Sequence, residues 1–137
     1  MPAKASRKPA PMPVCPCGGG VFADCCGRFI SQGAVPQTAL ELMRARYSAY
    51  VLRDERYLQA TWYGSTCPER VLQDDDGIKW LSLQILGHQE REGDATVEFV
   101  ARYKLHGRAQ KLHEISRFVC EQGCWYYLDG SFPDASS

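Results

Sequence analysis

The sequence predicts an α+β domain in which two helices cover an antiparallel sheet. Apolar residues recur at helical spacing between residues 38 and 62, whereas they alternate with polar residues in the segments after residue 78. Helices that come first and strands that then follow one another are typical of the α+β class. The chain has 137 residues, of which 45% are hydrophobic, so it is long enough for one domain with a substantial core.

Capping residues mark the starts of the two helices. Thr38 and Glu41 fit a capping box, in which the Thr38 hydroxyl accepts from the Glu41 N–H and the Glu41 side chain reaches back. The helix that follows carries an apolar stripe made of Leu40, Met43, Tyr47 and Val51. Asp54 is suited to cap a second, short helix that carries Tyr57, Leu58 and Thr61. We expect both helices to cover one face of the sheet.

The second half of the chain predicts four strands joined by tight turns. Alternation is clear in residues 79–85, 97–105 and 115–119, and a segment rich in β-forming residues follows at 124–130. Turn signals separate these segments, namely Glu92-Gly93-Asp94, His106-Gly107-Arg108 and Gln122-Gly123. Strands that follow each other through short turns pair as an antiparallel meander.

The front of the chain does not fit this domain pattern. Residues 1–13 contain four prolines, three basic residues and no core-forming pattern, which predicts a disordered arm. Residues 14–36 contain few large apolar side chains but four of the seven cysteines. A segment with this small number of apolar residues cannot form a core of its own. We therefore expect this cysteine module to have another source of stability.

The four cysteines predict a zinc site in this module. Cys15, Cys17, Cys25 and Cys26 lie within twelve residues, and zinc is commonly held by four thiolates in a tetrahedron. Adjacent cysteines in a strand would point in opposite directions, but at a helix start Cys25 and Cys26 are about 100° apart and can share one ion. A site closed by four protein ligands leaves no place for water. We therefore expect this zinc to fold the module rather than to catalyse a reaction.

The residues around the cysteines suit such a site. Asp24 is placed to cap the helix that starts with the cysteine pair. Residues 18–20 are all glycine, which allows a tight fold and leaves backbone N–H groups for the sulfurs. Arg28 is close enough in sequence to offset part of the charge of −2 that four thiolates leave on Zn²⁺.

Other roles for the cysteines remain open. Two crossed disulfides between the pairs, independent thiols, or an iron–sulfur cluster would use the same four residues, although local bridges within either pair have poor geometry. Cys67, Cys120 and Cys124 lie scattered in the second half of the chain and are expected to pack as buried apolar residues.

The motif that starts Cys15-Pro-Cys-Gly-Gly-Gly and ends Cys25-Cys26-Gly27 resembles the SEC-C motif, the small zinc module of the SecA translocation ATPase and of many other proteins. Three later stretches, which start at Glu41, Ala60 and Leu112, resemble the bacterial YchJ-like family. This resemblance implies a SEC-C-like zinc module at 14–36 and, at 37–133, an NTF2-like domain, a curved antiparallel sheet covered by helices. It also implies a protein partner for the zinc module. Where the motif commonly has serine and lysine, this chain has Gly19 and Val21, and the missing lysine weakens the case for an acidic partner surface.

Domains of the resembled fold often hold a pocket between sheet and helices. Residues that could line it for a small molecule are Arg44, Tyr47, Trp62, Arg102, Glu114 and Arg117. No Cys/His or Ser/His/Asp set can be recognised, so no catalytic residue is proposed and the question of enzymatic activity stays open, with a non-enzymatic role favoured.

The composition bears on partners and location. The 16 basic and 16 acidic residues balance, which does not favour nucleic acid as a partner. The N-terminus has no apolar run typical of a signal peptide, and no stretch approaches the roughly 20 apolar residues of a membrane span. We expect a cytoplasmic protein without a membrane association, where thiols are kept reduced.

Overall fold

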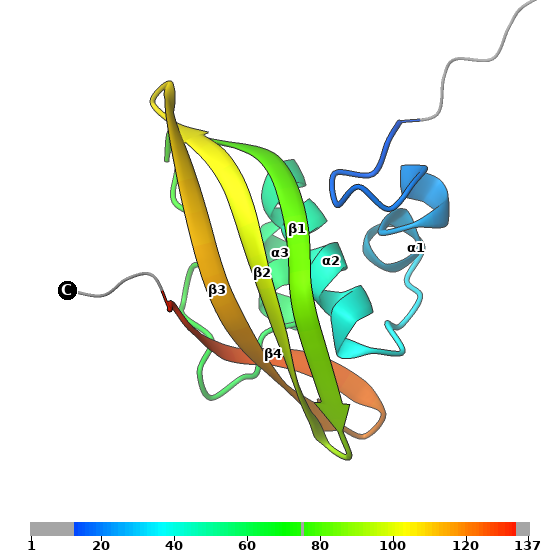
Figure 1. Cartoon of the computed structure of the whole chain (residues 1–137). Helices are drawn as coiled ribbons and strands as arrows, with labels where there is room; N and C mark the ends of the chain where they lie inside the picture. Colours follow the sequence, from blue (N-terminus) through cyan, green and yellow to red (C-terminus); the bar gives the residue numbers. More distant parts are fainter. Residues whose placement is uncertain (1–12, 75, 134–137) are drawn as a thin grey trace, which may run out of the picture.

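The computed structural model describes residues 13–74 and 76–133. Its elements in chain order are η2 (Phe22–Asp24), α1 (Gly27–Ile30), α2 (Ala39–Leu52), α3 (Glu55–Ala60), β1 (Ile78–Arg91), β2 (Asp94–Leu105), β3 (Arg108–Glu121) and β4 (Cys124–Ser131). The architecture is α+β, as predicted (Figure 1). The disordered arm expected at residues 1–13 lies outside the described residues except for Pro13.

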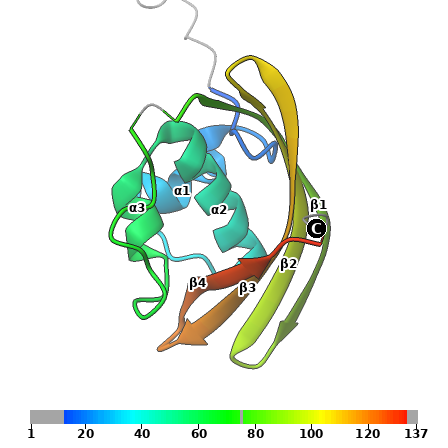
Figure 2. The ribbon, with the colours of Figure 1, turned by 90° about the vertical axis from the view of Figure 1, so that its left-hand side faces the viewer.

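The four strands form one antiparallel meander with the order β1-β2-β3-β4. Each tight turn contains a glycine with positive φ, at Gly93, Gly107 and Gly123, a conformation that costs glycine little. The sheet is strongly curved, and Figure 2 shows the helices on its concave side. The predicted meander and curved, helix-covered sheet are therefore confirmed.

Both predicted helix caps are present. The Thr38 hydroxyl accepts from the Glu41 N–H at 3.1 Å, and the Asp54 carboxylate accepts from the Tyr57 N–H at 3.0 Å. In a capping box the Glu41 side chain would accept from the N–H of the N-cap residue Thr38. Here the Glu41 carboxylate accepts from the N–H of the preceding residue, Gln37, at 2.7 Å. The local sequence therefore sets the starts of α2 and α3.

Helix α2 is buried on more sides than one apolar stripe would require. Met43 and Tyr47 of the predicted stripe are buried, but so are Leu42, Ala45 and Ala49 on other faces. The helix lies between the sheet and the cysteine module, and α3 packs beside it (Figure 1). Small residues at 45 and 49 allow this close packing, so α2 forms the centre of the molecule.

The core is continuous from the cysteine module into the sheet. One cluster of buried side chains contains Cys15, Cys17, Cys26 and Phe29 of the module together with residues of α2 and of strands β2, β3 and β4. A smaller cluster joins Ala49, Leu58 and Leu72. The module is therefore packed against the domain rather than tethered to it.

The two edges of the sheet differ. Beyond β4, Trp62 forms a parallel bridge with Tyr127, and backbone bonds join Tyr127 N–H to Thr61 C=O at 2.8 Å and Tyr63 N–H to Tyr127 C=O at 2.7 Å. β1 is the other edge strand, with no further strand paired to it among residues 13–74 and 76–133. The segment after α3 thus covers the middle of one edge only.

Candidate functional site

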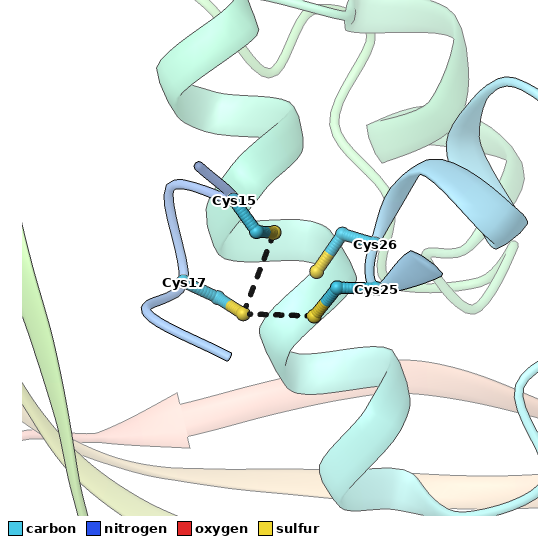
Figure 3. Close-up of side chains that lie close together, drawn as sticks. All are labelled: Cys15, Cys17, Cys25 and Cys26. Carbon is cyan, nitrogen blue, oxygen red and sulfur yellow. Dashed lines mark hydrogen bonds between the residues drawn. The ribbon is translucent and has the colours of Figure 1, made fainter. Parts of the chain in front are cut away.

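The four cysteines come from two short segments that face each other. Cys15 and Cys17 lie on a tight loop closed by a bridge between Val14 and Val21 and by a bond from Cys15 N–H to the Gly20 carbonyl. Cys25 follows η2, and Cys26 is the N-cap residue of α1. Figure 3 shows all four thiols directed toward a common centre beside α2.

The sulfur positions fit a single tetrahedral ion. All four Sγ atoms lie within 4.8 Å of one another, and the Cys15–Cys17 and Cys17–Cys25 Sγ distances are both 3.5 Å. Sulfurs about 2.3 Å from a zinc ion are about 3.8 Å from each other in a regular tetrahedron. The donor set therefore matches Zn²⁺ in ligand number, ligand type and spacing.

The cluster is nearly closed to solvent. Cys15 is 2% exposed and Cys26 1%, and Cys17 is also buried, whereas Cys25 is partly exposed. All seven cysteines are free thiols, so no disulfide competes for these four sulfurs. A mostly buried set of four thiols is typical of structural rather than catalytic metal sites.

The pKa values of Cys17, Cys25 and Cys26 are shifted in different directions. The pKa of Cys17 is lowered to about 4, first by a hydrogen bond from the Cys26 side chain. The pKa of Cys25 is raised to about 11, first by burial and then by its bond with Cys17. The Cys26 pKa is also raised, first by its bond to Cys17. Cys17 is thus a thiolate that neighbouring thiols stabilise, and a divalent cation would replace their protons.

Side chains of α2 complete the surroundings of the cluster. The Ser48 hydroxyl lies 3.5 Å from Cys15 Sγ, and the Arg44 guanidinium donates to the Cys17 carbonyl at 3.4 Å and lies 3.9 Å from its sulfur. Arg28, expected to offset the thiolate charge, instead donates to the Cys25 carbonyl at 2.9 Å and lies over the Phe29 ring. Arg44 is therefore the cation placed against a sulfur.

Asp24 does not have the expected capping role. It lies within η2, and neither η2 nor α1 has a side-chain cap. Cys26 itself takes the N-cap position of α1. Cys67, Cys120 and Cys124 lie outside the four-thiol cluster and are each partly exposed, so they do not pack as fully buried residues.

A second candidate site is a cavity of about 380 Å³ between α2 and the concave face of the sheet. Tyr47, Trp62 and Glu114 of the predicted pocket residues line this cavity. Arg44 lies at the cysteine cluster instead, Arg102 is exposed on β2, and Arg117 is exposed and pairs with Asp129 at 2.6 Å. The structure therefore brings three of the six predicted residues together.

The polar wall of the cavity contains residues that the pocket prediction missed. Arg46, only 4% exposed, donates to the Leu58 carbonyl at 2.8 Å and to the Thr61 hydroxyl at 2.7 Å. Its guanidinium lies over the rings of Trp62 and Tyr127, 5.1 and 4.7 Å from their centroids. Arg46 lies four residues before Tyr50, which also lines the cavity, so the two side chains are neighbours on α2. This spacing is the sequence signal that could have identified Arg46.

Glu114 is held within the same wall. Its Oε2 accepts from the Ser116 hydroxyl at 2.7 Å and from the Tyr127 hydroxyl at 2.9 Å. Burial raises the pKa of Tyr50 and of Tyr127, and the charge of Glu114 adds to both shifts. Burial also lowers the pKa of Arg46. The tyrosines thus stay protonated, and Tyr127 serves as a donor to the carboxylate.

Comparison with known proteins agrees with this architecture. Residues 38–130 match the family described as "YchJ, middle NTF2-like domain". A UPF0225 protein of Ralstonia nicotianae is 50% identical over 139 residues, which cover 93% of this chain and 96% of the relative. A UPF0225 protein of Chromobacterium violaceum is 50% identical over 122 residues, which cover 85% of this chain and 90% of the relative.

Two solved structures have the same fold. A SEC-C motif containing protein from Rhodopseudomonas palustris, solved in solution, aligns with a TM-score of 0.76 and 34% identity over 89% of this chain and 100% of that one. A crystal structure of a SEC-C motif containing protein from Psychrobacter arcticus aligns with a TM-score of 0.63 and 24% identity over 96% of this chain and 80% of that one. None of the helices in the described part of the chain is long and apolar enough to cross a membrane.

Proposed function

The chain belongs to the YchJ-like family of SEC-C motif proteins with an NTF2-like domain, and from this premise we propose that it is a zinc-binding protein whose cysteine module docks a protein partner. The observation that carries the proposal is the convergence of Cys15, Cys17, Cys25 and Cys26 within 4.8 Å of one another. Four thiols favour zinc over hard cations such as Mg²⁺ and Ca²⁺, which prefer oxygen ligands.

The zinc has a structural role in this proposal. The module from Val14 to Pro36 has few apolar residues of its own, and three of its buried side chains are the cysteines themselves. Binding of a metal to such a segment is coupled to its folding. The ion therefore fixes the two cysteine segments against α2, and the reducing cytoplasm is the compartment proposed for a protein with seven free thiols.

Exposed apolar residues on the module support a protein partner. Val14 is 76% exposed and Val35 47%, although both lie in the module that the ion would hold rigid. An exposed apolar side chain on a rigid support costs little conformational entropy when a partner covers it. Val21, which stands where the motif commonly has lysine, favours a partner surface that is not strongly acidic.

Metal content tests the first half of the proposal. Native mass spectrometry of reduced protein is expected to find one zinc ion per chain, and Cys15→Ser or Cys25→Ser to lose it. Cys67→Ser and Cys124→Ser are matched controls, because both residues lie outside the cluster, and they should keep the ion. A metal-free wild-type protein, or equal zinc content in all four variants, would contradict the proposal.

Docking of a protein partner through the module is tested with a variant that keeps the metal. We expect a partner captured by the wild-type protein to be lost from a Val14→Asp, Val35→Asp double variant with unchanged zinc content. Leu81→Asp is the control, since Leu81 is equally exposed but lies on β1, in the sheet. Partners that the double variant retains, or that Leu81→Asp also loses, would argue against docking through the module.

A further inference from the structure

The cavity beside α2 has the dimensions and the walls of a small-molecule site. Its volume of about 380 Å³ lies within the roughly 300–1,000 Å³ of such sites. The lining is dominated by rings and other apolar side chains, namely Met43, Tyr47, Trp62, Trp80, Phe99 and Phe118. Rings from both α2 and the sheet face it, so a flat molecule would find apolar contacts on two sides.

Among the described residues, two charged side chains of opposite sign line the cavity, so their charges cancel. Arg46 is engaged by the Leu58 carbonyl and the Thr61 hydroxyl and lies over two rings. Glu114 carries the opposite charge on the neighbouring wall. A charged ligand would lose its hydration in such a cavity without meeting a net opposite charge, which favours an uncharged ligand.

The Glu114 carboxylate has one oxygen left for a ligand. The Ser116 and Tyr127 hydroxyls both donate to Oε2. Within the described part of the chain, no residue donates to Oε1. Gly130 makes room for the group, because a Cβ at that position would come within 2.2 Å of Oε2. A carboxylate oxygen accepts hydrogen bonds, so Oε1 selects a hydrogen-bond donor, and the buried Nε1–H of Trp62, another lining residue, also has no hydrogen-bond partner within the described part of the chain.

We propose that this cavity binds an uncharged, planar, mainly apolar molecule whose single hydroxyl or N–H group donates to Oε1 of Glu114. This site is separate from the zinc module, because Arg44 and Ser48 of α2 face the cysteines whereas Arg46 and Tyr50 face the cavity. Binding of a ligand in this cavity does not depend on whether the cysteine cluster holds a metal.

A matched probe series on the metal-loaded full chain tests the ligand class. The probes are 2-naphthol, 2-methoxynaphthalene, 2-naphthoate and 2-naphthylmethylammonium, which share one ring system and differ in charge and donor capacity. We expect 2-naphthol to bind at least about fivefold more tightly than 2-methoxynaphthalene, because a hydrogen bond to a charged group is lost in the latter. The anion and the cation should bind more weakly than either neutral probe.

The indole N–H signals in an NMR titration locate the binding. Trp62 and Trp80 line the cavity and should shift with 2-naphthol, whereas Trp125 does not line it and should not. Glu114→Gln keeps the side-chain shape and is expected to abolish the preference for 2-naphthol over 2-methoxynaphthalene. Arg102→Gln, at an exposed position on β2, is the control and should leave the preference unchanged.

Each contrary result would overturn the proposal. These results are tighter binding of either ion than of 2-naphthol, equal binding of the two neutral probes, a shift confined to Trp125, or no binding of 2-naphthol at millimolar concentration. The wild-type series decides the matter even if Glu114→Gln fails to fold, and thermal unfolding of that variant shows whether it has.

Discussion

The hydroxyl of Ser48 lies 3.5 Å from the sulfur of Cys15, although 33 residues separate them in sequence. Ser48 is fully buried in the middle of α2, so this contact joins the cysteine cluster to the helix that also forms one wall of the cavity. A buried hydroxyl beside a thiolate ligand donates a hydrogen bond to it and stabilises its charge. Helix α2 therefore contacts the cysteine cluster as well as the cavity.

Ser48→Ala is expected to weaken zinc binding by about tenfold, because it removes this donor from the Cys15 sulfur. Alanine favours the helix more than serine does, so a loss of helix cannot explain a weaker site. Competition with a chromophoric chelator measures the affinity. Ser82→Ala, at an exposed position on β1, is the control, and equal affinities of the two variants would contradict the prediction.

Arg44→Gln is expected to lower zinc affinity several-fold, because its guanidinium lies 3.9 Å from the Cys17 sulfur and offsets the negative charge of the thiolates. The effect should weaken as salt is added, since Arg44 is only partly buried. The same chelator competition at two salt concentrations measures both. Arg56→Gln, an exposed arginine of α3, should leave the affinity unchanged.

Gly130→Ala is expected to lower the free energy of unfolding by about 1–3 kcal/mol. The new methyl group would meet the Glu114 carboxylate and displace it from the Ser116 and Tyr127 hydroxyls. Urea denaturation measures the change. Gly64→Ala is the matched control, because nothing lies within 4 Å of a Cβ at Gly64, and its effect should stay within about 0.5 kcal/mol.

Glu55 predicts a pH-dependent contribution to stability. Its carboxylate accepts from the N–H groups of Val71 and Leu72 at 2.8 and 2.9 Å, and these two bonds lower the pKa of Glu55 in the folded protein. A lowered folded pKa means that the contribution is complete above the unfolded pKa of about 4.3 and is lost as pH falls through the folded value.

The comparison of the wild type with Glu55→Gln isolates this contribution, since acid release of any bound metal would affect both proteins alike. We expect the wild type to be more stable at pH 7 and the difference to shrink below about pH 4. Urea denaturation over a pH series measures it. Glu69→Gln, at an exposed position in the loop that contains Val71 and Leu72, should show no such trend. A stability difference between wild type and Glu55→Gln that persists at low pH would refute the role given to the Glu55 carboxylate.

Local signals predicted the elements of the fold well. Thr38 and Asp54 set their helices through bonds to residues three positions away, and Gly93, Gly107 and Gly123 set the hairpins through their own backbone. Such interactions act within a few residues, so the sequence displays them directly. The four cysteines were likewise visible, because their spacing in the chain is short.

The roles of the two arginines of α2 required the tertiary structure. Arg44 was predicted to face the pocket and lies at the cysteines, whereas Arg46 lies in the cavity wall. The spacing of apolar residues predicted one buried stripe on the helix, but the cysteine module and α3 cover further faces, so burial alone does not distinguish the two residues. Arg102 and Arg117 were misplaced for a related reason, because their outward direction depends on the curvature and register of the sheet.

The segment from Thr61 to Tyr63 occupies the middle of the outer side of β4. By contrast, β1 has no strand paired to its outer side within the described part of the molecule, and with 14 residues against 8 it is a longer edge than β4. Strand-to-strand association between copies would therefore join two β1 strands and stop there. A fibre needs two pairing edges on every subunit, and the described residues offer one long unpaired edge.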